Sequence, residues 1–431
     1  MKEWNSATLL NLITAQKREQ LFEDLYGPLH DNHACLSRIQ RLLSRAVGDA
    51  AYLISAPGRT ELGGNHTDHN HGKVLCAAVR NDTLAAVTPR SDRKIRINSE
   101  GFPQAFEIDT DDLAPRDSEK GTTTALIRGV VAGFNQAGAK IGGFSAQITS
   151  NVSVGAGLSS SASFAVLIGT ILNKLYNDED IPAARIAQIG QYAENVFFSK
   201  PCGLMDQTAC AVGGVLAIDF ADPQKVAIRK LDVDLSAIDY VLTIVNTGSS
   251  HADLTDAYAS IPTEMKLIAG HLGAEVLGSF TENQIMDSMS SLRSRYGDRA
   301  VLRALHFMSE NKRVDQMVSA LNAGDFDKYL QLVRASGASS QTILQNTIPP
   351  GSDGKAQGVA FALGLSQLFF EAQGRGVARV HGGGFAGTIQ AYVHRNDFED
   401  YRTQMNLIFG DQTVERLIIR KHGATTILSL A

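Results

Sequence analysis

The chain has 431 residues, of which 44% are hydrophobic and 20% are charged, and its formal net charge is −5. This is the composition of an ordinary globular protein, and the net charge gives no general attraction to nucleic acid or to an anionic membrane. The sequence contains no stretch of about 18 apolar residues, the length that a membrane span requires. Because chains longer than about 250–300 residues usually need more than one hydrophobic core, we expect two domains.

The predicted elements, in chain order, mix helices and strands. Apolar residues recur at helical spacing between 7 and 43 and predict a helical N-terminal segment. The apolar run at 51–55 predicts a strand that ends in a turn at Ala56-Pro57-Gly58. The same kind of pattern continues in both halves of the chain, which favours α+β domains divided near residue 205. The other expected elements are strands at 74–78, 83–88, 143–150, 213–220 and 240–246, and helices at 122–136, from 164 to 171, at 186–198, within 285–332 and at 363–372.

The cysteines and the first residues bear on the compartment. Four cysteines are present, and no spacing among them is typical of a zinc site, so we expect reduced thiols. Residues 1–5 and the acidic residues after them lack the apolar core of a signal peptide. We therefore expect a cytoplasmic protein. The cysteines are Cys35, Cys76, Cys202 and Cys210.

A glycine- and serine-rich segment runs from Gly155 to Ser163 and opens an apolar helix. Glycines let a backbone approach a bulky anion, and the N–H groups of a helix N-terminus attract phosphate. The alternative is a simple turn with a capping serine, but three consecutive serines favour a phosphate loop. The segment is neither a Walker A loop nor a dinucleotide fingerprint, because the required lysine and third glycine are missing. The candidate ATP-binding residues are Gly155, Gly157, Leu158, Ser159, Ser160 and Ser161.

A dense polar cluster occupies residues 58–70, directly after the first predicted strand. It could be a solvated loop, or a metal site built from His66, Asp68, His69 and His71. No fixed zinc-ligand spacing supports the metal site. A sugar site is more natural, because asparagine, histidine and aspartate together donate to and accept from ring hydroxyls.

Four motifs together resemble the family of galactokinases, homoserine kinases, mevalonate kinases and phosphomevalonate kinases. The polar cluster is similar to the galactokinase signature Gly-Arg-x-Asn-Leu-Ile-Gly-Glu-His-Thr-Asp-Tyr-Asn, and the segment 155–163 to the family's phosphate loop. The segment 201–207 resembles the galactokinase Cys-Gly-x-Met-Asp-Gln, and the segment 381–387 resembles Gly-Gly-Gly-Phe-Gly-Gly. The motifs come in the family order and span most of the chain.

The resemblance implies a role for each matching residue. Asp206 falls at the catalytic aspartate, and Arg59 at an arginine beside the sugar's C1 hydroxyl and the γ-phosphate. Ser159, Ser160 and Glu194 fall at the positions that hold Mg²⁺. The sugar contacts fall at Asn65, His66, Asp68, Gly203 and Tyr258, the last aligned from Asn246 and His251.

The resemblance also implies a fold and an activity. We expect an N-terminal ribosomal-protein-S5-like domain over residues 1–205, a C-terminal ferredoxin-like domain over 206–431, and an active site in the cleft between them. The implied reaction is galactokinase chemistry: ATP, with Mg²⁺, phosphorylates galactose at its C1 hydroxyl and gives galactose 1-phosphate and ADP. The expected partners are the sugar and ATP, without nucleic acid or membrane, and we expect a monomer.

Several positions depart from the galactokinase pattern and leave the substrate open. Asn65 replaces the family glutamate that faces the C6 hydroxyl, Glu61 replaces an asparagine and His69 replaces a tyrosine. A glutamate would repel a C6 carboxylate, and galacturonate kinases also lack it, so a kinase for galacturonate or another C6-modified galactose is an alternative. A galactose-sensing regulator on the same fold is another. The complete phosphate loop, with Arg59 and Asp206, favours an enzyme.

Overall fold

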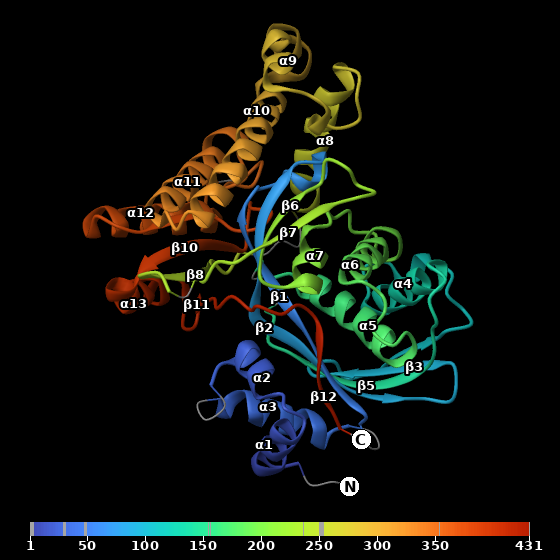
Figure 1. The fold of residues 1–431 in the computed structure, drawn as a ribbon. Helices are drawn as coiled ribbons and strands as arrows, with labels where there is room; N and C mark the ends of the chain where they lie inside the picture. The colour runs from blue at the N-terminus through green and yellow to red at the C-terminus, as the bar shows by residue number, and fades with distance from the viewer. Residues whose placement is uncertain are drawn as a thin grey trace.

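The computed structural model describes residues 4–28, 32–46, 50–153, 155, 157–235, 237–249, 254–352 and 354–430. These residues form a mixed α+β structure with an eight-stranded sheet and a four-stranded sheet (Figure 1). The expected α+β class is confirmed. The identity of each half as S5-like or ferredoxin-like stays a prediction.

The eight-stranded sheet is built around two long antiparallel strands, β1 (Tyr52–Gly63) and β2 (Lys73–Pro89). Its strand order is β12-β1-β2-β5-β3-β4, and β6 pairs with the first part of β2 and with β7. Among the strands that the described residues form in this sheet, only β3 and β5 pair in parallel. The other strands are β3 (Lys94–Ser99), β4 (Phe106–Asp109), β5 (Phe144–Ser150), β6 (Val215–Asp219), β7 (Ala227–Leu231) and β12 (Thr425–Ser429).

Helices cover both faces of this sheet. On one face, apolar side chains of the strands pack against a layer of helices that follow β4 and β5. On the other face, the N-terminal helices α1 (Ser6–Ala15), α2 (Glu19–Tyr26) and α3 (His33–Ser44) pack on β1, β2 and β12 through a separate apolar cluster (Figure 1). The first layer consists of α4 (Thr123–Gln136), α5 (Ser160–Tyr176), α6 (Ala183–Tyr192), the π-helix η4 (Ala193–Phe198) and α7 (Met205–Val212).

The four-stranded sheet has the order β11-β8-β10-β9, all antiparallel. Helices α11 and α12 pack on β9, and α13 packs beside β8 and β10. The strands are β8 (Tyr240–Asn246), β9 (Val377–Val380), β10 (Thr388–His394) and β11 (Val414–Arg416); the helices of this part are α8 (Thr255–His271), α9 (Glu282–Asp287), α10 (Met289–Asn322), α11 (Phe326–Ser339), the π-helix η6 (Ser340–Leu344), α12 (Gly358–Gln373) and α13 (Phe398–Phe409).

One sequence prediction fails at the start of the polar cluster. The expected turn at residues 56–58 is absent, because β1 continues to Gly63 and carries the first half of the cluster inside the sheet. A register shift against β2 between Pro57 and Arg59 accommodates the proline. The two strands expected at 74–78 and 83–88 are likewise one strand, β2. Arg59 and Glu61 therefore lie on a rigid strand and not on a loop.

The division of the chain at residues 205 and 206 stays a prediction. Helix α7 and strand β6 lie after it, yet Met205, Ala209, Leu216 and Ile218 belong to the core of the first sheet. This packing favours a division after β7, near residue 235, with β12 returning to the first sheet at the end of the chain.

Candidate active site

Arg59 and Asp206 form a two-point ion pair at the centre of the structure. The Arg59 Nε atom lies 2.6 Å from Oδ1 of Asp206, and its NH2 nitrogen lies 2.6 Å from Oδ2. Arg59 comes from β1 and Asp206 from the first turn of α7, so 147 residues of sequence separate the partners. The structure thus brings together the two residues predicted to be catalytic.

The phosphate-loop segment is tied to the same pair. The hydroxyl of Ser159 donates to Oδ2 of Asp206 at 2.7 Å, and Arg59 donates from NH1 to the carbonyl of Gly157 and from its backbone N–H to the carbonyl of Leu158. Gly157 has φ +70°, and a Cβ there would lie 2.7 Å from Nδ1 of His381, so the position requires glycine. Ser160 begins α5, whose free N-terminal N–H groups favour a phosphate.

Two details of this loop differ from the expectation. The side chain of Leu158 is fully buried, so it anchors the loop in the core and leaves only its backbone near the site. Ser159 adopts a left-handed conformation, with φ 58°, that turns its hydroxyl toward Asp206. Ala156 of the expected loop, and His251 used to align Tyr258, lie outside the described residues.

The environment keeps Asp206 ionised. Burial by itself raises the pKa of a carboxyl group, but the charge of Arg59 and the hydrogen bonds from Arg59 and Ser159 outweigh burial and lower the pKa of Asp206. The site therefore holds a charged carboxylate, oriented by three donors, at neutral pH.

Glu194 offers an unpartnered carboxylate oxygen near the phosphate loop. It lies on the π-helix η4, it is buried, and its Oε1 atom has no hydrogen-bond partner among the described residues. Burial raises the pKa of Glu194, while Lys200, with Nζ 4.0 Å from Oε2, and the neighbouring Ser161 counteract part of the shift. The serine that faces Glu194 is thus Ser161, whereas the hydroxyl of Ser159 is engaged by Asp206.

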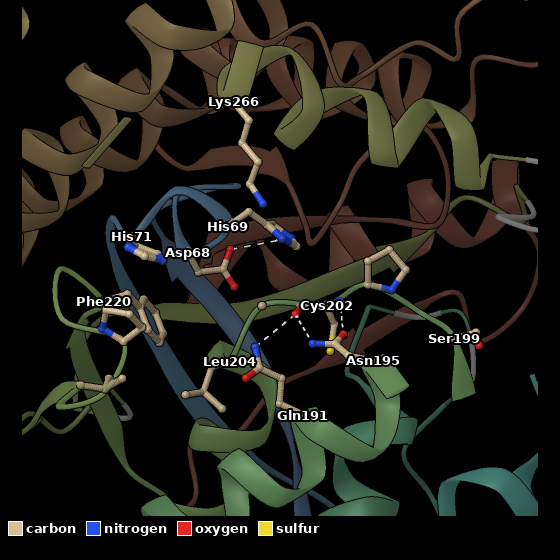
Figure 2. A pocket seen from close by; sticks show the side chains of 14 residues that line it. Asp68, His69, His71, Gln191, Asn195, Ser199, Cys202, Leu204, Phe220 and Lys266 are labelled. Atoms are coloured by element: carbon tan, nitrogen blue, oxygen red, sulfur yellow. Dashed lines mark hydrogen bonds and ion pairs between the residues drawn. The ribbon is translucent and has the colours of Figure 1, made fainter. Parts of the chain in front are cut away.

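A cavity of about 500 Å³ opens beside these groups and contains two of the predicted sugar contacts, Asp68 and Gly203 (Figure 2). The Asp68 carboxylate accepts no hydrogen bond from the described residues, and a Cβ at Gly203 would lie 1.8 Å from its Oδ2 atom. Asn195 and Gln191 hold the backbone of Cys202, at 2.8 and 3.2 Å, and so fix the position of Gly203. The cavity therefore presents the Asp68 carboxylate, whose Oδ1 atom lies 3.9 Å from Nε2 of His69, beside a glycine that leaves room for it.

The rings of His66, His69 and Tyr258 lie between this cavity and the glycine-rich segment 381–387. The Tyr258 hydroxyl lies 3.0 Å from Nε2 of His69, and the His66 and Tyr258 ring centroids are 5.1 Å apart. Burial, followed by the charges of Asp68 and Asp206, raises the pKa of Tyr258 well above its usual range. Burial lowers the pKa of His66 to about 3, so His66 is neutral; its Nε2 contacts the carbonyl of Gly383 at 2.9 Å.

Asn65 lies in a buried network of hydrogen bonds. Its side chain is fully buried, and its amide donates to the carbonyl of Gly382 at 2.7 Å and to both carboxylate oxygens of Glu61 at 3.2 Å. Its carbonyl oxygen accepts from Asn346 at 2.8 Å. Internal partners take up the amide in this structure, and a role of Asn65 in recognising C6 stays a prediction.

Residues that the sequence analysis did not single out complete this buried network. Arg379 of β9 is ion-paired with Glu61, and both side chains are almost fully buried. Burial raises the pKa of Glu61, and the charge of Arg379 counteracts that shift. Compared with the galactokinase signature, the carboxylate and the amide have exchanged positions 61 and 65, so the site keeps one of each. That exchange was the available signal in the sequence.

The histidine-rich metal alternative finds no support in the structure. Across residues 4–28, 32–46 and the remaining described ranges, no group of three or more histidine, cysteine or carboxylate side chains could hold a metal ion. Within the same described residues, no helix combines the length and the apolar character needed to cross a membrane.

Comparison with known proteins gives two family matches. Residues 125–214 match the GHMP kinases N terminal domain, and residues 43–89 match the galactokinase galactose-binding signature. The second match contains Arg59 and the polar cluster, and the first contains the phosphate loop, Glu194 and Asp206. Over these two segments the chain is similar to the GHMP kinases and to the galactokinases. The resemblance stated from the motifs is thereby confirmed.

Solved structures of GHMP kinases share the fold. A Lactococcus lactis galactokinase complexed with galactose matches with a TM-score of 0.73 at 24% identity, over 96% of this chain and 99% of that one. A Methanococcus jannaschii mevalonate kinase matches with a TM-score of 0.60 at 14% identity, over 86% and 99%. A Streptococcus pneumoniae phosphomevalonate kinase, in complex with phosphomevalonate and AMPPNP, matches with a TM-score of 0.57 at 15% identity, over 84% and 99%.

Proposed function

We propose that this protein is a galactose 1-kinase that transfers the γ-phosphoryl group of ATP to the C1 hydroxyl of galactose. The observation that carries the proposal is the two-point Arg59–Asp206 pair, fixed by Ser159 of the phosphate loop and bordered by the Asp68–Gly203 cavity. An ionised Asp206, bonded to Ser159 at the start of α5 and close in sequence to Gly203 of the cavity, supports phosphoryl transfer to a bound sugar. The galactose-binding signature over residues 43–89 supports the choice of sugar.

Each residue of the centre has a role in this reaction. Asp206 orients the C1 hydroxyl and accepts its proton as the hydroxyl oxygen bonds to phosphorus. Arg59 keeps Asp206 ionised and stabilises negative charge on the transferring group. Because a loose phosphoryl-transfer transition state needs positioning more than base strength, the lowered pKa of Asp206 is compatible with catalysis.

The chain's residues also suit ATP and Mg²⁺. The N–H groups at the start of α5, with Ser160, would receive the phosphates. Glu194 would hold Mg²⁺, with the nearby Ser161, through the buried oxygen that has no partner among the described residues. When bound, Mg²⁺ neutralises charge on the phosphate oxygens.

The test is ADP release from ATP and Mg²⁺ in the presence of galactose, galacturonate, N-acetylgalactosamine, glucose or arabinose. We expect galactose to give the highest kcat/KM and the product to carry phosphorus on C1. ADP release that is independent of any sugar in the panel would contradict the proposal.

A second candidate substrate is a galactose oxidised at C6, such as galacturonate. The specific observation is Lys266 of α8, which lines the cavity, points toward His69 and has no ion-pair partner among the described residues (Figure 2). An ammonium group at this place would favour a carboxylate on the sugar. Lys266→Gln decides between the two: it should lower kcat/KM for galacturonate about tenfold or more if the acid is the substrate, and leave galactose unchanged. Arg229→Gln, on exposed strand β7, is the charge-matched control.

The third alternative, a sugar-sensing regulator, is less well supported. A sensor needs no phosphoryl transfer, yet Arg59, Asp206, Ser159 and the unpartnered oxygen of Glu194 are all in place around one site. We therefore favour an enzyme.

A further inference from the structure

A second, smaller cavity of about 290 Å³ lies between the N-terminal helices and the edge where the two sheets approach each other. Its wall combines the start of α3, residues Arg80 and Asn81 of β2, Arg416 of β11, and Asn151, which follows β5. None of these residues belongs to the phosphate loop or to the Asp68–Gly203 cavity. The cavity is therefore separate from the proposed active site.

Three arginines line the cavity, and two of them, Arg80 and Arg416, have no ion-pair partner among the described residues. The Nε atom of Arg80 is buried without a hydrogen-bond partner in the same ranges. Burial, followed by the charge of Arg416, lowers the pKa of Arg80. Two like charges thus face one cavity, which disfavours the empty arrangement and favours an anion between them.

The neighbouring carboxylates are already engaged. Asp82 pairs with Arg38 and lies 3.4 Å from Arg420, and it also accepts hydrogen bonds from Tyr26 at 2.7 Å and Ser55 at 2.6 Å. Glu415, next to Arg416 in β11, accepts from Asn81 at 2.5 Å. No ion pair joins Glu415 to Arg416 among the described residues.

Helix α3 adds backbone donors to the same cavity. It has 12 residues, and its N-cap residue, Asn32, makes no side-chain capping bond. The N–H groups of a first helical turn have no partner within the helix, and Ala34 and Cys35 of this turn line the cavity. Guanidinium groups and helix N–H groups that approach from different elements are the donor set of a phosphate site.

We propose that this cavity binds a phosphate group, held by Arg80 and Arg416 with Arg38 and the first turn of α3. Donors from three elements suit a tetrahedral dianion better than a planar carboxylate. A volume of about 290 Å³ is at the lower end of ligand sites, which run from about 300 to 1,000 Å³, so the ligand is inorganic phosphate or a small phosphorylated metabolite and not a nucleotide.

The test is calorimetric titration of the full chain with inorganic phosphate, in saturating Mg-ADP to occupy the phosphate loop. We expect one phosphate per chain, at least tenfold weaker binding by Arg80→Gln/Arg416→Gln, and unchanged binding by the charge-matched control Arg229→Gln/Arg402→Gln. Arg416→Gln alone, at an exposed residue, should weaken binding several-fold without affecting the fold.

Three results would overturn the proposal. One is equal affinity in the wild type and Arg80→Gln/Arg416→Gln, another is no binding at millimolar phosphate, and the third is tighter binding of succinate than of phosphate. The arginine variants also separate this proposal from the proposed function. If Mg-ADP did not bind, the phosphate loop would stay open to inorganic phosphate. Phosphate bound there would show the same affinity in the wild type and in Arg80→Gln/Arg416→Gln.

Discussion

Replacing Asn65 by glutamate restores the residue of the galactokinase signature, and the structure predicts that the replacement alone is harmful. The Asn65 amide lies 3.2 Å from both carboxylate oxygens of Glu61, and both side chains are buried. Asn65→Glu would therefore place two carboxylates in contact, with Arg379 already paired to one of them. The substitution tests the buried network and is not a clean test of C6 recognition.

The folded variant can accommodate the second carboxyl group in two ways: both groups stay charged and repel each other, or one of them takes up a proton. At 3.2 Å and an effective dielectric constant of about 20, two charged carboxylates repel by about 5 kcal/mol. Taking up one proton at pH 7 costs about 4 kcal/mol for a carboxyl group with an ordinary pKa of about 4.3. The second route is cheaper, and burial already raises the pKa of Glu61, so the free energy of unfolding should fall by at most about 4 kcal/mol.

The sign of the pH dependence follows as well. The folded variant binds one more proton than the unfolded chain, so its stability decreases as the pH rises. The deficit relative to the wild type should shrink by up to about 1.4 kcal/mol for each unit below pH 7, until it disappears near the ordinary glutamate pKa.

The assay is urea denaturation at several pH values, with Asn65→Gln as a control that has the length of glutamate without its charge. The difference between Asn65→Glu and Asn65→Gln isolates the charge. Glu61→Asn/Asn65→Glu, which carries the signature order, should be more stable than Asn65→Glu despite its second change. Equal stability of Asn65→Glu and Asn65→Gln, or no recovery in the double variant, would refute the reasoning.

Two further predictions concern the metal and the sugar. Because burial raises the pKa of Glu194 and a metal ligand must be deprotonated, the Mg²⁺ concentration for half-maximal rate should rise as the pH falls. Glu194→Gln should raise this Mg²⁺ concentration at every pH and remove its pH dependence. An unchanged Mg²⁺ requirement in Glu194→Gln would count against the ligand role. Gly203→Ala puts a methyl group 1.8 Å from Oδ2 of Asp68. It should raise the KM for sugar about 10–100-fold, as expected for one lost hydrogen bond to a charged group, while the KM for ATP stays constant. An unchanged sugar KM would exclude Asp68 as a sugar contact.

Local sequence patterns predicted the regular elements well where neighbouring residues decide the structure. The strand expected at 240–246 is β8, and the helix expected at 122–136 is α4 within one residue. The prediction failed at Pro57-Gly58, because that dipeptide is typical of turns. Pairing with β2, in which Pro57 lies opposite Asp82, together with a register shift, keeps the segment extended.

The same limit applies to the predicted site residues. Arg59, Asp206 and Ser159 carry chemistry that matches family motifs, so the motifs alone brought them together. The position of Asn65 depends on Gly382 and Asn346, which lie roughly 280 to 320 residues away in sequence and meet it only after folding. The exchange of carboxylate and amide at positions 61 and 65 is visible locally, but it does not identify these distant partners.

The most direct test of galactose 1-kinase chemistry at the Arg59–Asp206 pair is the rate of galactose 1-phosphate formation by the wild type and by Asp206→Asn. Proton-coupled ³¹P NMR identifies the product, because a C1 phosphate couples to the anomeric proton. Asp206→Asn keeps the shape of the side chain and removes its charge, so we predict a turnover lower by at least about 10²–10³-fold with unchanged ADP affinity. Phosphorus on another carbon of the sugar, or near wild-type turnover in Asp206→Asn, would contradict it.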